Sequence, residues 1–245
     1  ERAVLDGFQN AAEAAQPALL AIDEAHCISQ WGHDFRPEYT QIDRLRERLE
    51  VPTIALTATA TPRVIEEMVN HLHLDEPVII RGDFSRPNLS FSVQPHRTDS
   101  ARLEALTHLL AERGFRARSA GRSIIYCATR KKVEQVHQHL KGQGFPAGYY
   151  HAGRKESDRT AAHKAYETNR TPVLVATNAF GMGIDNPDVR LIVHAQTPGS
   201  LEAYYQEAGR AGRDGAPADC VLFFGVQDLV TQRRISSGSR SKAVA

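Results

Sequence analysis

Short apolar runs, rich in β-branched residues, recur along the 245-residue chain and are separated by helical patterns. The runs at residues 18–22, 123–127 and 173–176 are apolar almost throughout instead of alternating between apolar and polar residues. A strand of that kind is buried on both faces, which is typical of parallel sheets covered by helices. Further runs predict strands at residues 53–56, 77–81, 191–193 and 220–224. The strands fall into two sets, so we expect an α/β fold with two parallel-sheet units.

The segments between the predicted strands carry helix signals. Thr61-Pro62 is typical of a helix start, with Thr61 as the cap and Pro62 at the first helical position. The apolar residues that follow have the spacing of one helix face: Ile65, Met68, Val69 and Leu72. Similar patterns predict helices at about residues 103–113, 129–141, 157–168 and 200–208.

The formal net charge of +1 hides a division along the chain. Residues 1–84 carry 7 basic and 15 acidic side chains, whereas residues 85–245 carry 23 basic and 14 acidic ones. This asymmetry suggests two units, of which the second is suited to a polyanion; the alternative is that the charges only keep both surfaces solvated. We predict domains at residues 1–84 and 85–230, with a linker that begins near residue 82. The small, polar end of the chain predicts a disordered tail over residues 231–245.

Composition excludes several classes of protein. No run of 18 apolar residues occurs, which excludes a membrane-spanning helix within this sequence, and no secretory signal is visible at its start. Cys27, Cys127 and Cys220 lie too far apart in the sequence for a disulfide framework or a zinc cluster. This cysteine usage favours a reducing compartment.

The first chemical motif, Asp23-Glu24-Ala25-His26, directly follows the predicted strand at residues 18–22. Ligands bind at the carboxyl ends of strands in parallel sheets, and two adjacent carboxylates there suit a nucleotide site. Asp23 can hold Mg²⁺ through its water shell, and Glu24 can orient or deprotonate the water that attacks a γ-phosphate. The alternative is a polar strand end that faces solvent.

Aromatic and basic residues follow this motif in the stretch CISQWGHDFRPEY, which holds Trp31, His33, Phe35 and Arg36. Aromatic faces stack on unpaired bases, at about 1–3 kcal/mol each, and arginine adds cation–π and phosphate contacts. The loop is therefore a candidate DNA-binding element joined directly to Glu24. In the alternative interpretation, Trp31 and Phe35 are core residues that anchor the loop.

The stretch AIDEAHCISQWGHDFRPEY, with ALTATATP about thirty residues later, resembles the helicases of superfamily 2 and specifically the RecQ family. Further motifs follow in the family's order, so the resemblance covers residues 1 to about 230. It implies two RecA-like parallel-sheet domains, the first of them incomplete, which bind ATP with Mg²⁺ and single-stranded DNA. It also implies that His26 and Gln206 contact ATP.

Hydroxylated residues at predicted strand ends carry the next motifs. Thr57 and Thr59, in TATAT, resemble the motif that couples the nucleotide state to strand separation, and their hydroxyls can bond to the DEAH side chains. Thr129 and Arg130 open a helix whose free backbone N–H groups can bind a DNA phosphate, unless Thr129 is only the helix cap. The resemblance gives Thr177 a second DNA phosphate contact.

The last motif is QEAGRAGRDG, in which Arg210 and Arg213 lie three residues apart beside glycines. Arginine binds phosphate oxygens bidentately, and an arginine that reaches the γ-phosphate accelerates analogous phosphoryl transfer about 10³–10⁵-fold. We predict Arg213 as that arginine finger and Arg210 as a sensor of the nucleotide state, with the order between the two left open. The resemblance places Asp185 near the nucleotide sugar or these arginines.

The sequence contains no G-x-x-x-x-G-K-[ST] loop, which cradles the phosphates of ATP in this family. We therefore expect an N-terminally truncated piece that is inactive alone. The parent protein is expected to be an ATP-dependent 3′–5′ DNA helicase that acts on single-stranded and branched DNA in recombination and repair. The alternatives are a nucleic-acid-binding protein without ATPase activity and an RNA helicase of the same superfamily. The expected location is the nucleoid in bacterial cytoplasm, or the nucleus in a eukaryote.

Overall fold

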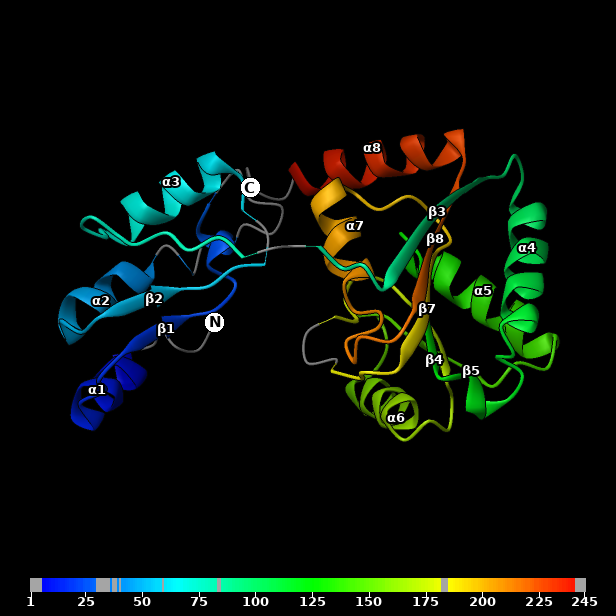
Figure 1. Ribbon diagram of the computed structural model, residues 1–245, viewed down its shortest axis with the longest axis horizontal. Helices are drawn as coiled ribbons and strands as arrows, with labels where there is room; N and C mark the ends of the chain where they lie inside the picture. Colours follow the sequence, from blue (N-terminus) through cyan, green and yellow to red (C-terminus); the bar gives the residue numbers. More distant parts are fainter. Residues whose placement is uncertain are drawn as a thin grey trace. The chain divides into compact units, whose positions relative to one another are not determined.

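The computed structural model describes residues 6–29, 36, 39, 41–58, 60–82, 85–181 and 185–240, the side chains of residues 6–9 and 236–240 excepted. The chain divides into two compact units, Glu1–Phe84 and Ser85–Ala245 (Figure 1). Both units are built from parallel strands and helices, so the predicted α/β class is confirmed. None of the helices in the described ranges has the length and apolar character that a bilayer crossing requires.

The first unit contains a small parallel sheet beside three helices. Its elements are α1 (Asp6–Ala15), β1 (Leu20–Ile22), a 3-10 helix (Ala25–Ile28), α2 (Ile42–Leu49), β2 (Thr53–Ala55) and α3 (Pro62–His71). Within the described residues the sheet has two strands, with Ile22 of β1 opposite Ala55 of β2. The core forms where Ile22 of β1 and Ile28 of the 3-10 helix meet Met68 of α3 and Leu72, the residue that follows α3.

Helix α3 begins as the sequence predicts. The side chain of Thr61 accepts a hydrogen bond from the Val64 N–H at 3.3 Å. Pro62 occupies the first helical turn, where a backbone N–H would have no partner within the helix, so proline loses no hydrogen bond there. Met68 and Leu72 of the predicted apolar stripe are buried, together with Val64. The stripe therefore directs one face of α3 onto β1.

The strand predicted at residues 77–81 is wrong. These residues have no regular structure, and the side chains of Val78 and Ile80 are each 88% exposed. A strand needs hydrogen-bonding neighbours, and among the described residues β2 pairs with β1 alone. An apolar hollow of about 640 Å³ lies between residues 77–81, β2 and α3.

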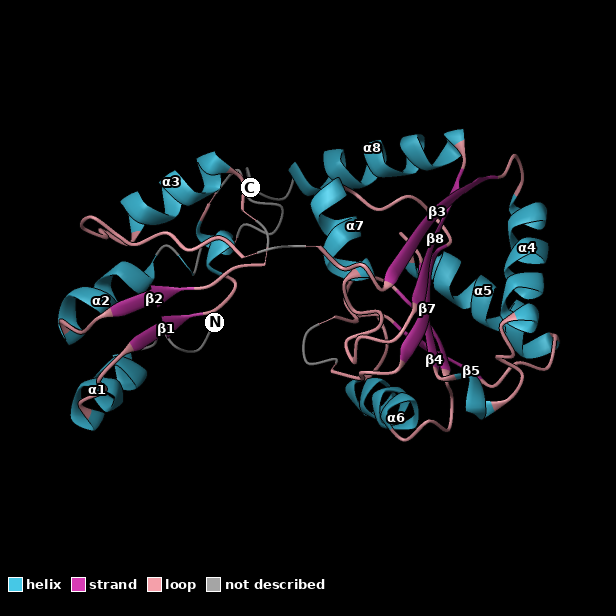
Figure 2. Ribbon diagram, viewed as in Figure 1, coloured by secondary structure: helices cyan, strands magenta, loops and turns pink. Residues whose placement is uncertain are grey.

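The second unit contains a six-stranded parallel sheet with the strand order β3-β8-β7-β4-β6-β5. Figure 2 shows this sheet with helices around it. Its strands are β3 (Leu89–Pro95), β4 (Arg122–Tyr126), β5 (Ala147–Tyr150), β6 (Val173–Ala176), β7 (Val189–His194) and β8 (Ala218–Phe224). Its helices are α4 (Asp99–Glu112), α5 (Arg130–Gly142), α6 (Glu156–Glu167), α7 (Leu201–Ala208) and α8 (Val226–Arg240), with a 3-10 turn at Arg118–Ala120. The predicted helices and strands of this unit are thus present within a few residues of their expected bounds.

Both faces of this sheet are buried, as the continuous apolar strands predict. Ile125 and Val175 lie in one core cluster with residues of α4 and α5. Their chain neighbours Ile124 and Leu174 lie in a second cluster with Tyr166 of α6 and Ala208 of α7. Alternate residues of one strand therefore enter opposite cores, which is why the strands are apolar at every position.

Both ends of the second unit hold elements that the sequence does not predict. Residues 89–95 form β3, which pairs in parallel with β8 at the edge of the sheet. An edge strand keeps exposed positions, so its serines and Pro95 hide the apolar pattern. At the other end, residues 231–240 continue helix α8 instead of forming a disordered tail.

A buried ion pair attaches α8 to the rest of this unit. The Arg102 guanidinium on α4 donates to both carboxylate oxygens of Asp228 on α8, at 2.8 Å each, and to the Ala195 carbonyl at 3.1 Å. The two side chains are 6% and 2% exposed. Asp228 also accepts hydrogen bonds from the Gly225 N–H and the Thr197 hydroxyl. The start of α8 is thereby held against α4 and the end of β7.

Replacing Asp228 with asparagine is expected to lower the free energy of unfolding by about 3–5 kcal/mol, because the Arg102 charge stays buried without its partner. Urea unfolding followed by circular dichroism measures the loss. Glu112→Gln is the matched control, since it removes a carboxylate from the exposed His108–Glu112 pair on α4 and is expected to change the free energy by less than about 1 kcal/mol. Equal effects of the two substitutions would contradict the prediction.

Candidate functional site

Asp23 and Glu24 are the first residues after β1, which ends at Ile22. The Asp23 side chain is exposed, and its Oδ1 accepts a hydrogen bond from the Glu24 N–H at 2.8 Å. Both carboxylates therefore stand at the carboxyl end of a parallel strand, where ligand sites form in such sheets.

Glu24 has a left-handed backbone, with φ 49° and ψ 39°. That conformation costs an L-residue about 1–2 kcal/mol, and such strain gathers at functional sites. Its Oε2 is buried 3.3 Å from Nδ1 of His26 and has no hydrogen-bond partner among the described residues. The Glu24 side chain as a whole is 43% exposed, so it reaches from the protein interior to solvent.

His26 connects the ends of the two strands in the first unit. It is buried, and its Nδ1 lies 3.0 Å from Oγ1 of Thr57, just beyond β2. The backbones are joined as well, since the Leu56 N–H donates to the Ile22 carbonyl and the Ala25 N–H donates to the Leu56 carbonyl. The DEAH motif and Thr57 are thus in contact, as expected from their residue types. Thr59 lies outside the described residues.

Two residues from the end of the aromatic loop, Arg36 and Tyr39, make backbone hydrogen bonds. The Arg36 N–H donates to the Cys27 carbonyl at 2.9 Å, and the Tyr39 N–H donates to the Arg36 carbonyl at 2.9 Å. Burial, followed by the nearby Cys27, raises the pKa of the Tyr39 phenol. Arg36 is therefore bonded to the buried 3-10 helix that contains His26 of the DEAH motif. Trp31, His33 and Phe35 lie outside the described residues.

In the second unit, predicted DNA-contacting residues follow adjacent strands. Thr129 comes after β4 and Thr177 after β6, and these two strands pair in the sheet. Oγ1 of Thr129 accepts the Lys132 N–H at 3.2 Å, so this side chain is a helix cap. Thr177 is buried, and its Oγ1 accepts the Ala179 N–H at 3.4 Å. Their hydroxyls stabilise local turns at the carboxyl edge of the sheet.

Arg130 is exposed and lies over Gly153, which follows β5. A Cβ at residue 153 would come within 2.9 Å of Nη1 of Arg130. Glycine at this position therefore allows the Arg130 side chain to cross the backbone. Sequence reasoning did not give Gly153 a role, although a glycine in the motif YHAG is a signal for close approach.

Arg210 is half-buried, and its side chain is held by Gly181. Its Nη1 donates to the Gly181 carbonyl, and a Cβ at Gly181 would stand 2.7 Å from its Nη2. The guanidinium lies close to the phenol of Tyr126, whose pKa is raised by burial and lowered less by this arginine. Tyr126, a contact that the sequence analysis missed, donates to the Phe180 carbonyl at 3.2 Å. Arg210 is therefore fixed in place.

Arg213 has a more open environment. Its side chain is 37% exposed, and Nη1 lies 2.7 Å from Oδ1 of Asp185, which is 88% exposed. An ion pair this open is worth about 0–1 kcal/mol, so the guanidinium can exchange Asp185 for a phosphate at little cost. The structure thus brings Asp185 to the arginine motif. Gln206 lies half-buried on α7, one turn before Arg210.

The three cysteines, Cys27, Cys127 and Cys220, are buried and form no disulfide. Burial raises the pKa of Cys127 and of Cys220 to about 12, so these two thiols are protonated at neutral pH and are poor nucleophiles. The described residues contain no group of three or more histidine, cysteine or acidic side chains arranged to hold a metal ion.

Comparisons with known proteins match both units to helicases. The family model described as DEAD/DEAH box helicase matches residues 2–68, and the model described as helicase conserved C-terminal domain matches residues 101–215. Among solved structures, Saccharomyces cerevisiae Dbp5 bound to RNA and ADP BeF3 has a TM-score of 0.68 at 20% identity. That match covers 90% of this chain and 56% of Dbp5, and it establishes the RecA-like fold.

The sequence is closer to another group of helicases. It is 45% identical over 218 residues to the ATP-dependent DNA helicase RecQ of Bacillus subtilis, which covers 88% of this chain and 35% of that protein. It is 41% identical over 234 residues to the RecQ-like DNA helicase BLM of Xenopus laevis, covering 95% of this chain and 17% of that protein. The chain thus spans between a sixth and about a third of the length of these relatives. With the DEAH and arginine motifs in their expected places, this similarity shows that the chain belongs to the RecQ family of helicases.

Proposed function

We propose that this chain contributes ATP-hydrolysing and DNA-gripping residues to an ATP-dependent DNA helicase with 3′–5′ polarity. The observation that carries the proposal is the contact between the DEAH motif and Thr57, with Arg36 hydrogen-bonded to Cys27 of the same 3-10 helix. In this arrangement a change at the nucleotide reaches both the strand end at Thr57 and the loop through bonded atoms.

Asp23 and Glu24 are proposed to act on ATP and water. An exposed carboxylate at a strand end fits Mg²⁺, which keeps several waters and needs only one or two protein oxygens. When bound, Mg²⁺ offsets the charge that develops on the phosphates during transfer. Glu24 would then hold the attacking water with its carboxylate and take its proton, while Asp23 orients the water shell of the ion.

Arg213 is proposed as the arginine finger, and Arg210 as the residue that senses the nucleotide state. The open pair with Asp185 supports this order, because Arg213 can leave a solvent-exposed partner. Arg210 is engaged with Gly181 and Tyr126 and has less freedom to move. His26 and Gln206 are proposed as further contacts to ATP, His26 through its position beside Glu24.

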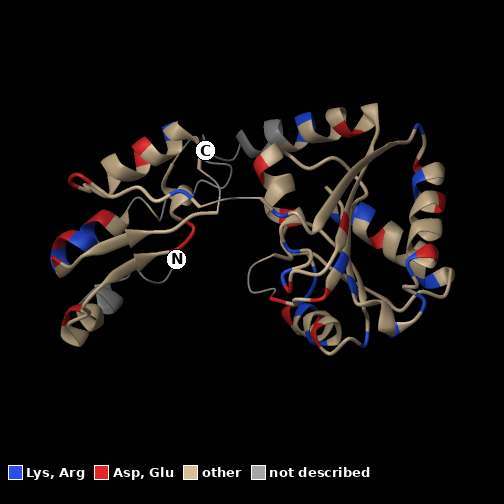
Figure 3. Cartoon of the chain, viewed as in Figure 1, with Lys and Arg blue, Asp and Glu red and all other residues tan. Residues whose placement is uncertain are grey.

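The proposed partner is single-stranded DNA, including the single-stranded parts of branched DNA. The second unit carries 23 of the 30 basic side chains, several of them on its loops (Figure 3). Trp31, His33, Phe35 and Arg36 are proposed to stack on bases and contact phosphates. Arg130 is proposed to contact the DNA backbone directly. Because the hydroxyls of Thr129 and Thr177 serve turns, their proposed contribution is through the backbone N–H groups beside them.

The test is ATP hydrolysis by the 245 residues, with and without single-stranded DNA, together with DNA binding measured by fluorescence anisotropy at several salt concentrations. We expect salt-sensitive DNA binding, because phosphate contacts release counterions, and no turnover, because the sequence has no phosphate-cradling loop. We expect DNA-stimulated turnover in a longer chain that contains these residues and such a loop. The ATP-hydrolysing form is the chain, of either length, that shows turnover.

Three outcomes would change the proposal. Stronger stimulation of the ATP-hydrolysing form by RNA than by DNA would favour an RNA helicase. DNA binding with no turnover in any form would favour a nucleic-acid-binding protein without ATPase activity. Failure of the chain to bind single-stranded DNA at low salt would contradict the proposed partner.

A further inference from the structure

Two residues just after the boundary between the units hold the loop that carries Arg210 and Arg213. We propose that Arg86 and Asn88 are positioning residues for this arginine loop, defined as residues 209–216, and that they attach it to the segment joining the units. The proposal rests on the proposed function, since it concerns the arginines that act on ATP. Neither residue is expected to touch the nucleotide.

The Arg86 guanidinium binds three carbonyls of the arginine loop. Nη1 donates to Gly209 at 3.2 Å, and Nη2 donates to Ala211 at 2.8 Å and to Gly212 at 2.9 Å. These carbonyls lie just past the C-terminal end of α7, where the helix dipole favours a cation. Arginine suits the task because its donors are planar and fixed relative to one another.

Asn88 fixes the turn in the middle of the loop. Its Nδ2 donates to the carbonyls of Gly212 at 2.8 Å and Ala216 at 3.0 Å. Gly212 has a left-handed φ of 52°, and a Cβ there would stand 2.5 Å from Nδ2 of Asn88. The turn therefore combines a backbone that only glycine adopts easily with an amide in direct contact. Arg213 is the residue that follows this held glycine.

The strands next to the loop hold it from the other side. The Gly212 N–H donates to the Val189 carbonyl at the start of β7. The guanidinium of Arg190 on β7 pairs with the Asp214 carboxylate, and this pairing lowers the pKa of Asp214. The backbone on both sides of Arg213 is thus fixed, while its side chain stays partly exposed. An exposed guanidinium on a fixed backbone is suited to meeting a phosphate without prior rearrangement.

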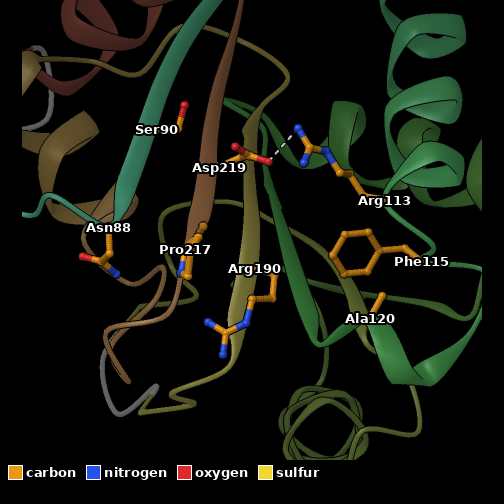
Figure 4. Close-up of a pocket in the computed structure, with 9 residues that line it drawn as sticks. Asn88, Ser90, Arg113, Phe115, Ala120, Arg190, Pro217 and Asp219 are labelled. Carbon is orange, nitrogen blue, oxygen red and sulfur yellow. Dashed lines mark ion pairs between the residues drawn. The ribbon is translucent and has the colours of Figure 1, made fainter.

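A pocket of about 210 Å³ lies beside Asn88, between the starts of β3, β7 and β8 (Figure 4). Arg113 and Arg190 are among its lining residues, but Arg113 pairs with Asp219 at 2.9 Å and Arg190 pairs with Asp214. Because carboxylates already balance these arginines, we assign the pocket no anion. Its position shows that Asn88 stands at the margin of the sheet, where β3 begins.

Arg86 lies at the start of the second unit. Phe84 ends the first unit, so Arg86 is the second residue of the second unit. The Leu89 N–H donates to the Arg86 carbonyl, and the Ala218 N–H donates to the Asn88 carbonyl. Arg86 and Asn88 thus link the first residues of the second unit to the arginine loop.

The test is Arg86→Gln in the ATP-hydrolysing form. A displacement of about 1 Å at a catalytic group can cost about 100-fold in rate, so we expect kcat to fall about 10–100-fold with KM for ATP unchanged within about twofold. Arg86→Lys keeps the positive charge but lacks the planar set of donors, so its kcat is expected to lie between those of the wild type and Arg86→Gln. Arg116→Gln is the matched control: Arg116 also donates to a carbonyl after a helix, Gln143 beyond α5, away from the arginine loop, and kcat is expected to stay unchanged.

A double substitution separates positioning from general stability. If Arg86 acts through Arg213, Arg86→Gln is expected to have little further effect on kcat in an Arg213→Ala background. An equal fold-loss in both backgrounds, or an equal loss in Arg116→Gln, would overturn the proposal. Hydrogen exchange on the 245-residue chain reports the contact itself, with faster exchange expected at Gly212 in Arg86→Gln. If Arg213→Ala leaves turnover intact, the proposed function of the loop fails, and exchange at Gly212 still shows whether Arg86 holds the loop.

Discussion

Replacing Arg213 with alanine is expected to lower ATP turnover by about 10³–10⁵-fold, the range measured for arginine fingers in other phosphoryl-transfer enzymes. The structural reason is the combination of a fixed backbone and an open side chain. Residues 209–216 are bonded to Arg86, Asn88 and β7, while the Arg213 guanidinium has an exposed partner in Asp185. The loss should be mainly in kcat, because the contact forms as charge develops on the γ-phosphate.

Measurement of turnover and stability in the same variants tests this assignment. Arg213→Ala is expected to leave the urea midpoint of unfolding nearly unchanged, because the removed ion pair is exposed. Arg210→Ala should lower that midpoint, because it removes a guanidinium that is bonded to Gly181 and lies close to Tyr126, and it leaves the Gly181 carbonyl without this donor. Full turnover by Arg213→Ala, with turnover lost in Arg210→Ala, would reverse the roles of the two arginines.

The extent of correct prediction differs between the units for a physical reason. Each central strand of the second unit is buried on both faces, so its sequence is apolar at every position and is easy to recognise. The edge strand β3 exposes much of its surface, and the sequence therefore gives a linker-like pattern there. At residues 77–81 the prediction failed for the opposite reason: the apolar run suits a strand, but it has no pairing neighbour in the described structure.

Site residues were predictable where the chemistry is local in sequence. Asp23 and Glu24 follow a strand, and the capping role of Thr129 was one of two interpretations that its position allowed. The contacts that hold the arginines were not predictable, because Arg86 and Gly212 are 126 residues apart. No local pattern marks a guanidinium that will bind carbonyls so distant in the chain. Arg86 also lies in a segment whose prolines indicate a linker, which concealed its role.

Replacing Glu24 with glutamine is expected to lower ATP hydrolysis by about 10²–10⁴-fold, the usual contribution of a positioned general base. The amide has the same shape but cannot take a proton from water. Nucleotide binding should stay within about threefold, because Asp23 and the strand end that carries it are unchanged. The left-handed backbone at residue 24 is equally strained with either side chain, so the unfolding midpoint should also change little.

Two readouts distinguish loss of a base from loss of the site. Binding of a fluorescent ATP analogue to the ATP-hydrolysing form measures the site, and phosphate release measures chemistry. Glu13→Gln is the control within the first unit. It removes the carboxylate of the exposed ion pair between Glu13 on α1 and Arg48 on α2, and it should alter neither readout. Retained hydrolysis in Glu24→Gln would show that another group activates water. Lost binding would instead mean that the buried contact between Glu24 and His26 shapes the nucleotide site. In that case Thr57→Ala should weaken nucleotide binding too, because it removes the hydroxyl that lies 3.0 Å from His26.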